Sequence, residues 1–444
     1  MNPIAPTRTL IVGGGGREHA LAWKLAAEPG GNEIVVAPGS DAIGLEPRVR
    51  CVPGVDPLDP AAVVAVARRV AAELVIVGPE APLAAGVSDA LREAGIAVFG
   101  PSRAAARIES SKAFCHEIAA AAGVPMARAA WFTDPGVAGR FATELAEGGR
   151  GVVVKADGLA AGKGVTVCDT PAEAQVAIRH LFAADPTGSV VIEERLSGLE
   201  ASLIAICDGR MAVGLPLSRD HKRLGDGDTG PNTGGMGAYS PLPDLPETRI
   251  ASLLDAFHRP ILAELARRGT RFQGALYAGL ILTANGPVLL ECNARFGDPE
   301  TQAILPRVAI ALGPILLAAA RGDLASTLPG SVLDAGRVPE LPGATVAIVL
   351  AAAGYPVRPR TGDPIDGLDE AAARGALVFH AGTSIDPDGT VRTAGGRVLS
   401  VVGRGADAVV AGRAAGAAAE LVTAPGLQRR HDIGTQPVAA GAGR

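Results

Sequence analysis

Strand and helix patterns alternate through the first hundred residues, and this alternation restricts the possible folds more than any other feature of the chain. Apolar runs typical of strands alternate with helical patterns in the order 9–12, 17–27, 33–37, 61–72, 74–77, 83–94 and 97–100. Strands separated by helices pair in parallel, and the helices then cover both faces of the sheet. We therefore predict an open parallel α/β domain over residues 1–103.

The pattern changes after Pro101. A long helix is predicted near 104–122, and strands, hairpin signals and further helices follow until a last helix near 299–320, which is typical of an α+β domain. The predicted divisions are a central domain at 104–335 with a lid at about 124–194, a small accessory α/β domain at 336–426, and a flexible tail at 427–444.

The charge balance and the cysteines exclude several classes of protein. The chain has 41 basic and 46 acidic residues, a formal net charge of −5 and no basic block, so we expect neither nucleic-acid nor membrane binding. Its five cysteines are scattered without the spacing of a zinc site or a disulfide framework. No apolar run reaches the roughly 20 residues that span a bilayer. These features favour the reducing cytoplasm.

Four consecutive glycines stand between the first predicted strand and the first helix: Gly13, Gly14, Gly15 and Gly16. Glycines at a helix N-terminus let backbone N–H groups approach a phosphate. The dinucleotide fingerprint GxGxxG fails in both registers, because Glu18 or His19 stands where the third glycine belongs. The segment is therefore either an anion-binding loop or a tight turn that binds nothing.

Two lysines flank a glycine-rich turn. Lys155 follows three valines at a strand end, and Lys163 stands between Gly162 and Gly164. Such a hairpin brings two ammonium groups to a polyphosphate. The segment is not a Walker A loop, because glycine rather than Ser or Thr follows Lys163. The alternative for Lys163 is an ordinary exposed turn lysine.

Acidic residues end two further apolar strands. Glu193 and Glu194 close one of them, with Glu200 nearby, and this pattern indicates either a nucleotide cleft or a solvated sheet edge. Alternation in the second strand places Glu291, Asn293 and Arg295 on one face, and Cys292 and Ala294 on the other. Two hard oxygen donors two residues apart suit Mg²⁺ that also binds nucleotide phosphates.

A polar, glycine-rich segment at 218–243 lacks periodicity and is either a linker or a functional loop. Its acids, bases and glycines, from Asp220 to Asn232 and beyond, suit a zwitterionic small molecule. We interpret His221 as a hydrogen-bonding loop residue rather than a general base. The other histidines form no ligand-spaced cluster, and no nucleophile pattern is apparent.

Together these segments resemble the phosphoribosylamine-glycine ligase (glycinamide ribonucleotide synthetase) family of the ATP-grasp superfamily, from Leu10 to about Val402. The segments that carry the resemblance are GGGGREHAL at 13–21, GPEAPL at 78–83, ESSKAF at 109–114, VKADGLAAGKGV at 154–165, DHKRLGDGDTGPNTGGMGAYSP at 220–241, NARFGDPETQ at 293–302, AAGYP at 352–356 and HAGT at 380–383.

The resemblance implies a central ATP-grasp domain and an ATP-dependent ligase of purine biosynthesis. In this family glycine, 5-phosphoribosylamine and ATP give glycinamide ribonucleotide, ADP and phosphate through glycyl phosphate. The implied cofactors are ATP and Mg²⁺ (or Mn²⁺), and the implied state is a monomer or weak homodimer. No protein nucleophile is needed, because the protein supplies positioning and charge neutralisation.

The resemblance also implies roles for individual residues. Lys112 and Lys155 are implied to contact the ATP phosphates, with Gly162, Lys163 and Gly164 as a cover. The residues implied to line the adenine pocket are Glu193, Glu194 and Leu196, and Glu200 is implied to bind the ribose. Glu291 and Asn293 are the implied metal ligands. Asp220 is implied to bind the ammonium of glycine and Arg295 its carboxylate. Gly13 to Gly16 and Glu80 are implied to bind phosphoribosylamine, and Asn232 is a further implied substrate-binding residue. Lys155, Asp220 and Arg295 are the expected catalytic residues.

Four residues depart from the family's usual pattern. Arg219 replaces a glutamine, Cys292 a phenylalanine, Ala353 an acid and His116 a lysine. Arg219 is the departure most relevant to substrate affinity, because it adjoins Asp220.

Three alternatives stay open at this point. Another ATP-grasp ligase or carboxylase shares the phosphate and metal residues, but the segment at 220–241 favours the glycine ligase. A non-catalytic nucleotide-binding regulator is disfavoured by the intact Lys155, Glu291 and Asn293. An NAD-dependent oxidoreductase is disfavoured by the failed fingerprint.

Overall fold

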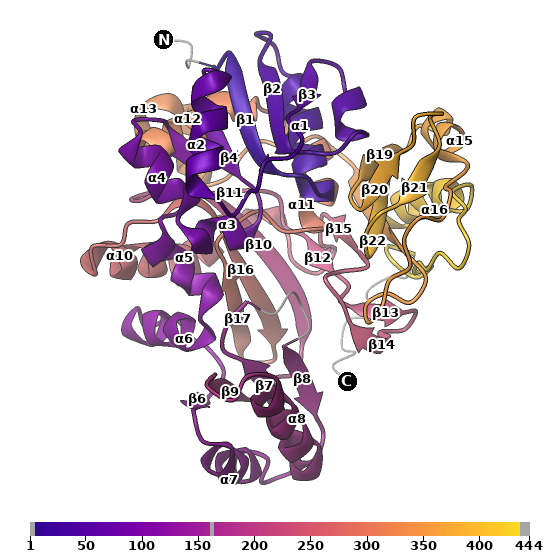
Figure 1. Cartoon of the computed structure of the whole chain (residues 1–444). Helices are drawn as coiled ribbons and strands as arrows, with labels where there is room; N and C mark the ends of the chain where they lie inside the picture. The colour runs from indigo at the N-terminus through magenta and orange to yellow at the C-terminus, as the bar shows by residue number, and fades with distance from the viewer. Residues whose placement is uncertain (1–4, 160–163, 436–444) are drawn as a thin grey trace.

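The computed structural model describes residues 5–159 and 164–435. A parallel five-stranded sheet in the order β3-β2-β1-β4-β5 forms the N-terminal domain, as the alternation predicts (Figure 1). Its strands are β1 (Arg8–Gly13), β2 (Glu33–Pro38), β3 (Val49–Cys51), β4 (Leu74–Val77) and β5 (Val98–Phe99). Its helices are α1 (Gly16–Ala26), α2 (Pro60–Arg69), α3 (Glu80–Ala85) and α4 (Val87–Glu93).

Alternate residues of these strands belong to different hydrophobic cores. Leu10 and Val75 lie in the cluster that contains residues of α2, α3 and α4. Ile11 and Ile76 lie in the cluster that contains residues of α1. Because successive side chains of a strand point to opposite faces, both faces of the sheet are buried.

The central domain is built on an antiparallel sheet in the order β11-β10-β16-β17 (Figure 1). Its strands are β10 (Leu199–Asp208), β11 (Ala212–Gly214), β16 (Gln273–Thr283) and β17 (Gly286–Asn293). Its helices are α5 (Arg103–Ser110), α6 (Lys112–Ala121), α9 (Ile250–Leu253), α10 (Arg259–Arg267), α11 (Glu300–Ile304), α12 (Leu312–Arg321), α13 (Leu324–Thr327) and α14 (Gly330–Ala335). Helix α12 packs on β10 and β16, and α5 and α6 contact β17.

Two long helices predicted from the sequence are divided in the structure. Ser111 adopts an extended conformation between α5 and α6, and its hydroxyl accepts a bond from the Phe114 amide as the cap of α6. The predicted helix at 299–320 is α11, which continues directly into a 3-10 turn at Leu305–Arg307, and α12, which follows after extended residues at Val308 and Ala311. Apolar periodicity continues through such breaks, so it does not reveal them.

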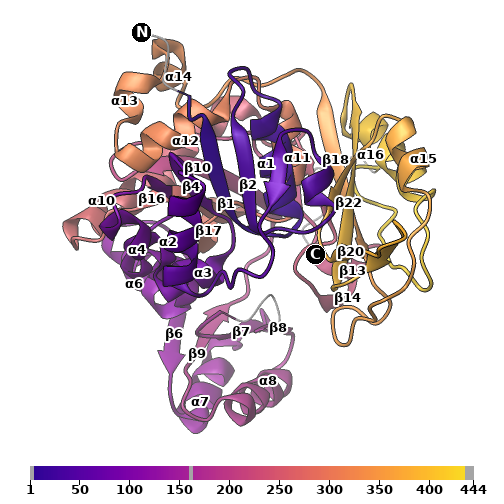
Figure 2. The same ribbon diagram turned by 45° about the horizontal axis from the view of Figure 1, so that its top comes forward.

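The segment at 124–194, which we predicted to be a lid and call the lid below, has its own small hydrophobic core. Its sheet has the order β6-β9-β7-β8, and its two helices pack against each other and against the sheet (Figure 2). The elements are β6 (Ala129–Phe132), α7 (Pro135–Leu145), β7 (Val152–Ala156), β8 (Val165–Cys168), α8 (Pro171–Ala184) and β9 (Val190–Glu194). No residue of this core belongs to the two larger clusters of the described chain.

The C-terminal sheet includes strands from the central part of the chain. Its order is β12-β15-β18-β22-β19, and β12 (Arg219–Asp220) and β15 (Gly237–Ser240) come from the polar segment at 218–243. That segment is therefore part of a folded sheet rather than a linker. The remaining elements are the hairpin β13 (Arg223–Gly225) and β14 (Thr229–Asn232), β18 (Ala344–Ala351), α15 (Leu368–Ala373), β19 (Leu377–His380), β20 (Thr383–Ile385), β21 (Val391–Thr393), β22 (Arg397–Gly405) and α16 (Ala408–Ala419).

Residues 427–435, which we expected to lie in a flexible tail, are packed against the C-terminal domain. Gln428 exchanges two backbone hydrogen bonds with Ala351, and Ile433 is fully buried. The Gly- and Ala-rich composition concealed these contacts because they are tertiary. Across the described ranges, no helix is long and apolar enough to cross a membrane.

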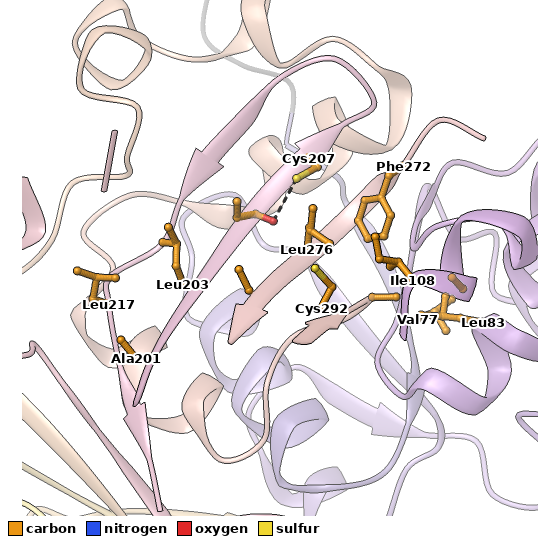
Figure 3. Close-up of a cluster of buried hydrophobic side chains, with 14 of the residues drawn as sticks. Val77, Leu83, Ile108, Ala201, Leu203, Cys207, Leu217, Phe272, Leu276 and Cys292 are labelled. Carbon is orange, nitrogen blue, oxygen red and sulfur yellow. Dashed lines mark hydrogen bonds between the residues drawn. The ribbon is translucent and has the colours of Figure 1, made fainter. Parts of the chain in front are cut away.

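The central core gives a first prediction. Leu276 on β16 is fully buried in one cluster with Leu203 and Phe272 (Figure 3). We expect Leu276→Ala to destabilise the protein by about 2–5 kcal/mol, because apolar contacts are lost and a cavity remains. Calorimetric unfolding checks this through a lower Tm. The control Leu45→Ala, at a side chain that is 76% exposed, shifts stability by less than about 0.5 kcal/mol. Equal Tm shifts for both variants contradict the core assignment.

Candidate functional site

A cavity of about 580 Å³ lies where the four parts of the molecule meet. The N-terminal domain contributes Arg17 and Glu80, the lid Lys155, the central sheet Glu291, and the C-terminal domain Arg397. Among the described lining residues, six are Lys or Arg and seven are Asp or Glu. Such a mixture suits ligands that carry both positive and negative charges, and the volume of the cavity is in the range of small-molecule sites.

Strand alternation directs two charged side chains of the lid into this cavity. Val152, Val154 and Ile192 face the helices of the lid, so Lys155 on β7 and Glu193 on β9 face the opposite side. The Lys155 Nζ lies 2.7 Å from Glu193 Oε2. Burial would raise the pKa of Glu193, but the ammonium of Lys155 and the bond from His116 outweigh it and lower the pKa.

Lys112 enters the cavity from the first turn of α6. Its Nζ donates to the Gly158 carbonyl at 3.0 Å, while the Ala113 amide donates to Asp157. Burial is the main reason that the pKa of Lys112 is lowered, and the nearby charge of Lys155 lowers it further. Two ammonium groups that repel each other across a cavity are stabilised by an anion between them.

Glu291 and Asn293 lie on the same side of β17 and both line the cavity, as predicted. Cys292 and Ala294 between and after them belong to a hydrophobic cluster, with Cys292 labelled in Figure 3. Gly279 is the cross-strand neighbour of Glu291, and a Cβ on this glycine would lie 3.1 Å from the Glu291 Cγ. The glycine therefore provides the space that the glutamate occupies.

The donor set at this strand end fits a magnesium ion. Burial would raise the pKa of Glu291, but Lys222, Lys155 and Lys112 together outweigh it, so the pKa is lowered and the carboxylate is anionic. Within 5–159 and 164–435, no group of three His, Cys, Asp or Glu residues is arranged to hold a metal. A carboxylate and an amide oxygen instead suit Mg²⁺ that keeps waters and shares phosphate oxygens.

Arg295, just beyond β17, pairs with acids from two other elements. Its Nη2 lies 3.0 Å from Glu109 Oε1 on α5, and its Nε lies 3.3 Å from Glu80 Oε2 on α3. Burial would lower the pKa of Arg295, but these carboxylates raise it. Two residues expected to contact different substrates, Arg295 and Glu80, are therefore in direct contact.

Asp220 on β12 lies buried among like charges. Burial is the main reason that its pKa is raised to about 7, and the carboxylates of Glu300 and Glu200 add to the effect. Lys222 opposes the shift, with its Nζ 3.7 Å from Asp220 Oδ1 and 2.5 Å from Glu200 Oε2. An excess of acid at this end of the cavity suits an ammonium group.

The four N-terminal glycines form a tight turn that packs against the protein itself. Gly13 has a φ of +126°, and a Cβ on Gly14 would lie 2.7 Å from the Gly39 carbonyl. The Gly15 amide donates to Glu18 Oε2 at 2.7 Å. Gly13 to Gly16 are not among the lining residues, whereas the next residue, Arg17, is.

The other expected ATP residues are distributed as follows. Gly164 lines the cavity, and Gly162 and Lys163 lie outside the described residues. The Glu194 carboxylate accepts a bond from the Arg128 amide, away from the cavity. The expected residues that the cavity lining does not include are Gly13 to Gly16, Glu194, Leu196, Glu200 and Asn232.

Several lining residues were missed by the sequence reasoning. Lys222 and Glu300 lie inside segments that carry the family resemblance, so the charged residues of those segments were the available signal. Glu109 begins another such string, and Arg397 follows the pair Gly395-Gly396. The Lys, Arg, Asp, Glu and Tyr lining residues to which we had given no role are Arg17, Glu109, Lys222, Tyr277, Asp298, Glu300, Tyr355 and Arg397.

Arg219, the departure next to Asp220, points away from the cavity. Its guanidinium pairs with Asp244, at 2.7 Å from Oδ2, and donates to the Tyr239 hydroxyl at 2.7 Å. It is not a lining residue. His116, another departure, does line the cavity and contacts Glu193 at 3.0 Å.

Three family models match consecutive parts of the chain. They describe the N domain, the ATP-grasp (A) domain and the C domain of phosphoribosylglycinamide synthetase, and they match residues 7–109, 110–301 and 345–436. The expected three-part architecture with a central ATP-grasp domain is thereby confirmed.

Individual relatives are similar to this chain over nearly its full length. A phosphoribosylamine–glycine ligase of Streptomyces coelicolor is 48% identical, with 98% of this chain and 100% of the relative covered. The phosphoribosylamine–glycine ligase of Vibrio parahaemolyticus is 44% identical, with 97% of this chain and 99% of the relative covered.

Solved structures show the same architecture. The crystal structure of the phosphoribosylamine–glycine ligase of Thermotoga maritima has a TM-score of 0.78 at 33% identity, with 96% of this chain and 100% of that chain covered. A Campylobacter jejuni biotin carboxylase shares the fold alone, with a TM-score of 0.69 at 15% identity. The match covers 97% of this chain and 94% of the carboxylase. The chain therefore belongs to the phosphoribosylamine–glycine ligase family.

Proposed function

We propose that this chain uses ATP to ligate glycine to 5-phosphoribosylamine, which gives glycinamide ribonucleotide, ADP and phosphate in purine biosynthesis. The observation that carries the proposal is a single cavity that holds a lysine pair, a pair of hard oxygen donors and a buried acid. Lys112 with Lys155, Glu291 with Asn293, and Asp220 all line it. The relatives named above, matched over nearly their full length, support the same reaction.

In this proposal ATP lies with its phosphates between Lys112 and Lys155, beside Gly164. Glu193 holds Lys155 in place and borders the adenine site, to which Glu194 and Leu196 contribute through the backbone. Glu200 lies at the ribose. The two ammonium groups neutralise phosphate charge, which lowers the barrier to phosphoryl transfer.

Glu291 and Asn293 would hold Mg²⁺ or Mn²⁺ at the phosphates. When bound, the ion neutralises phosphate charge and orients the nucleotide. The donor chemistry fits this assignment because the Glu291 carboxylate is anionic and faces the same cavity as the lysines.

Glycine binds with its ammonium at Asp220 and its carboxylate near Arg295. One carboxylate oxygen attacks the γ-phosphorus, and the oxygen that bridges the β and γ phosphates leaves with ADP. The amine of phosphoribosylamine then attacks the carbonyl carbon of glycyl phosphate, phosphate leaves, and the nitrogen loses a proton. Gly13 to Gly16, Glu80 and Asn232 contribute to substrate binding. The protein accelerates both steps by holding the reacting groups together.

The cellular compartment and the oligomeric state are part of the same proposal. All five cysteines are free, and four of them are buried. This arrangement accords with a reducing cytoplasm. We propose a monomer or weak homodimer that acts on these small molecules, with no nucleic-acid or membrane partner.

Omitting substrates one at a time tests the function. Purified protein is given Mg-ATP, glycine, and phosphoribosylamine formed in place from ribose 5-phosphate and ammonia, and ADP release is measured. We expect release only when both glycine and the sugar amine are present. Release without that dual requirement indicates another ATP-grasp acceptor, and ATP binding without release indicates a nucleotide-binding regulator.

The metal assignment gives a second prediction. Glu291→Gln keeps the shape of the side chain but removes its charge, so we expect turnover to be lost while the Tm and ATP-free fold are retained. ADP release and calorimetry measure the two effects. The control Glu147→Gln changes an exposed glutamate of the lid and leaves turnover intact. Retained activity in Glu291→Gln contradicts the metal role.

Asp220 gives a pH prediction. Its pKa of about 7 makes the carboxyl anionic above neutrality and uncharged below it. Because only the anion pairs with glycine's ammonium, we expect kcat/KM for glycine to fall as pH decreases through about 7. Asp220→Asn should have a low kcat/KM without this pH dependence. A wild-type profile that stays flat between about pH 6 and 8 contradicts the assignment.

A further inference from the structure

The C-terminal segment at 428–435 lies against the hairpin β13–β14, which Figure 1 shows at the lower edge of the C-terminal domain. The hairpin pairs only with itself within the described sheets. Its position therefore depends on side-chain contacts, and most of those that tether it come from this segment.

Arg430 makes the central contacts. Its side chain is 1% exposed, and its Nη1 donates to Asp228 Oδ1 at 2.6 Å in the turn of the hairpin and to the Arg223 carbonyl at 3.3 Å. Its Nε and Nη2 donate to the two oxygens of Asp432 at 2.8 and 2.6 Å. A bidentate pair of this kind fixes the orientation of the guanidinium.

Two further bonds connect the segment to the same turn. Asp432 Oδ2 accepts from the Gly227 amide at 2.9 Å. The His431 amide donates to Asp226 Oδ1 at 2.7 Å, and its Nδ1 lies 3.0 Å from Asp226 Oδ2. Residues 226–228 are thus held from three consecutive positions of the C-terminal segment.

The two ends of the hairpin lead directly into the cavity. Lys222 precedes β13, Thr233 follows β14, and both line the cavity. The Thr233 amide and hydroxyl each donate to the Lys222 carbonyl at 2.8 Å. Asp220 lies two residues before Lys222, so displacement of the hairpin shifts Lys222 relative to Asp220.

We propose that Arg430 is a positioning residue that holds the hairpin and thereby keeps Lys222 and Asp220 in place for the small amino-acid substrate. The inference rests on the proposed function, because it assigns Asp220 to glycine. Arg430 acts only through the hairpin: it is absent from the cavity lining, and ATP lies at the opposite, lid-facing residues.

Arg430→Ala tests the proposal. It leaves Asp228 and Asp432 without their cation, so the hairpin loses its main tether. We expect the KM for glycine to rise by about tenfold or more, while the KM for ATP changes by less than about twofold. Arg430→Lys should restore part of the glycine affinity. The matched control Arg429→Ala removes a neighbouring arginine that donates to the Ala419 carbonyl, and leaves both constants unchanged.

Hydrogen exchange without substrates provides a second readout that is independent of catalysis. The amides of residues 223–232 should exchange faster in Arg430→Ala than in the wild type or in Arg429→Ala. Unchanged exchange at the hairpin, or equal rises in both KM values, overturns the proposal. If wild-type protein shows no glycine-dependent ADP release, the proposed function fails, while the exchange result still decides whether Arg430 holds the hairpin.

If Arg430→Ala does not fold, Asp228→Asn provides the test. The Asp228 side chain is 66% exposed, so the substitution leaves the core intact but removes one of the two carboxylates on Arg430. We expect a smaller rise in the KM for glycine and faster exchange confined to the hairpin. A wild-type KM together with wild-type exchange overturns the proposal.

Discussion

The buried guanidinium of Arg295 is the interaction on which the arrangement of the site depends. It leaves the end of β17 and pairs with Glu109 on α5 and with Glu80 on α3, so one side chain links the central sheet to the N-terminal domain. A buried charge is tolerated only where such partners replace water. These ion pairs, together with hydrophobic clusters that both domains share, hold the two domains against each other, and the cavity lies at this junction.

The lid positions its charged side chains through a hydrophobic core of its own. Its core is separate from the two larger clusters, and it presents Lys155 and Glu193 to the cavity from the face opposite its own helices. Contacts within that core hold the strands that carry the two side chains. This construction is consistent with the positioning and charge neutralisation that phosphoryl transfer requires.

The polar segment at 218–243 contributes both to the C-terminal sheet and to the cavity. Residues near Asp220 and Tyr239 form strands of the C-terminal sheet, while Lys222 and Thr233 line the cavity. The C-terminal segment around Arg430 holds the hairpin between them. Residues almost at the end of the described chain thus support a site whose other components begin at Arg17.

The sequence by itself determined the parallel N-terminal sheet and the family, and it singled out Lys155, Glu291 and Asn293, which all line the cavity, because alternation and motif strings are local properties of the chain. It did not reveal the breaks in the long helices or the packing of residues 427–435. Only the tertiary structure decided that Glu194 faces Arg128, that Arg295 pairs with Glu80, and that Asp220 is buried among acids. Ion pairs and burial join residues far apart in the chain, and no local pattern encodes which partners meet.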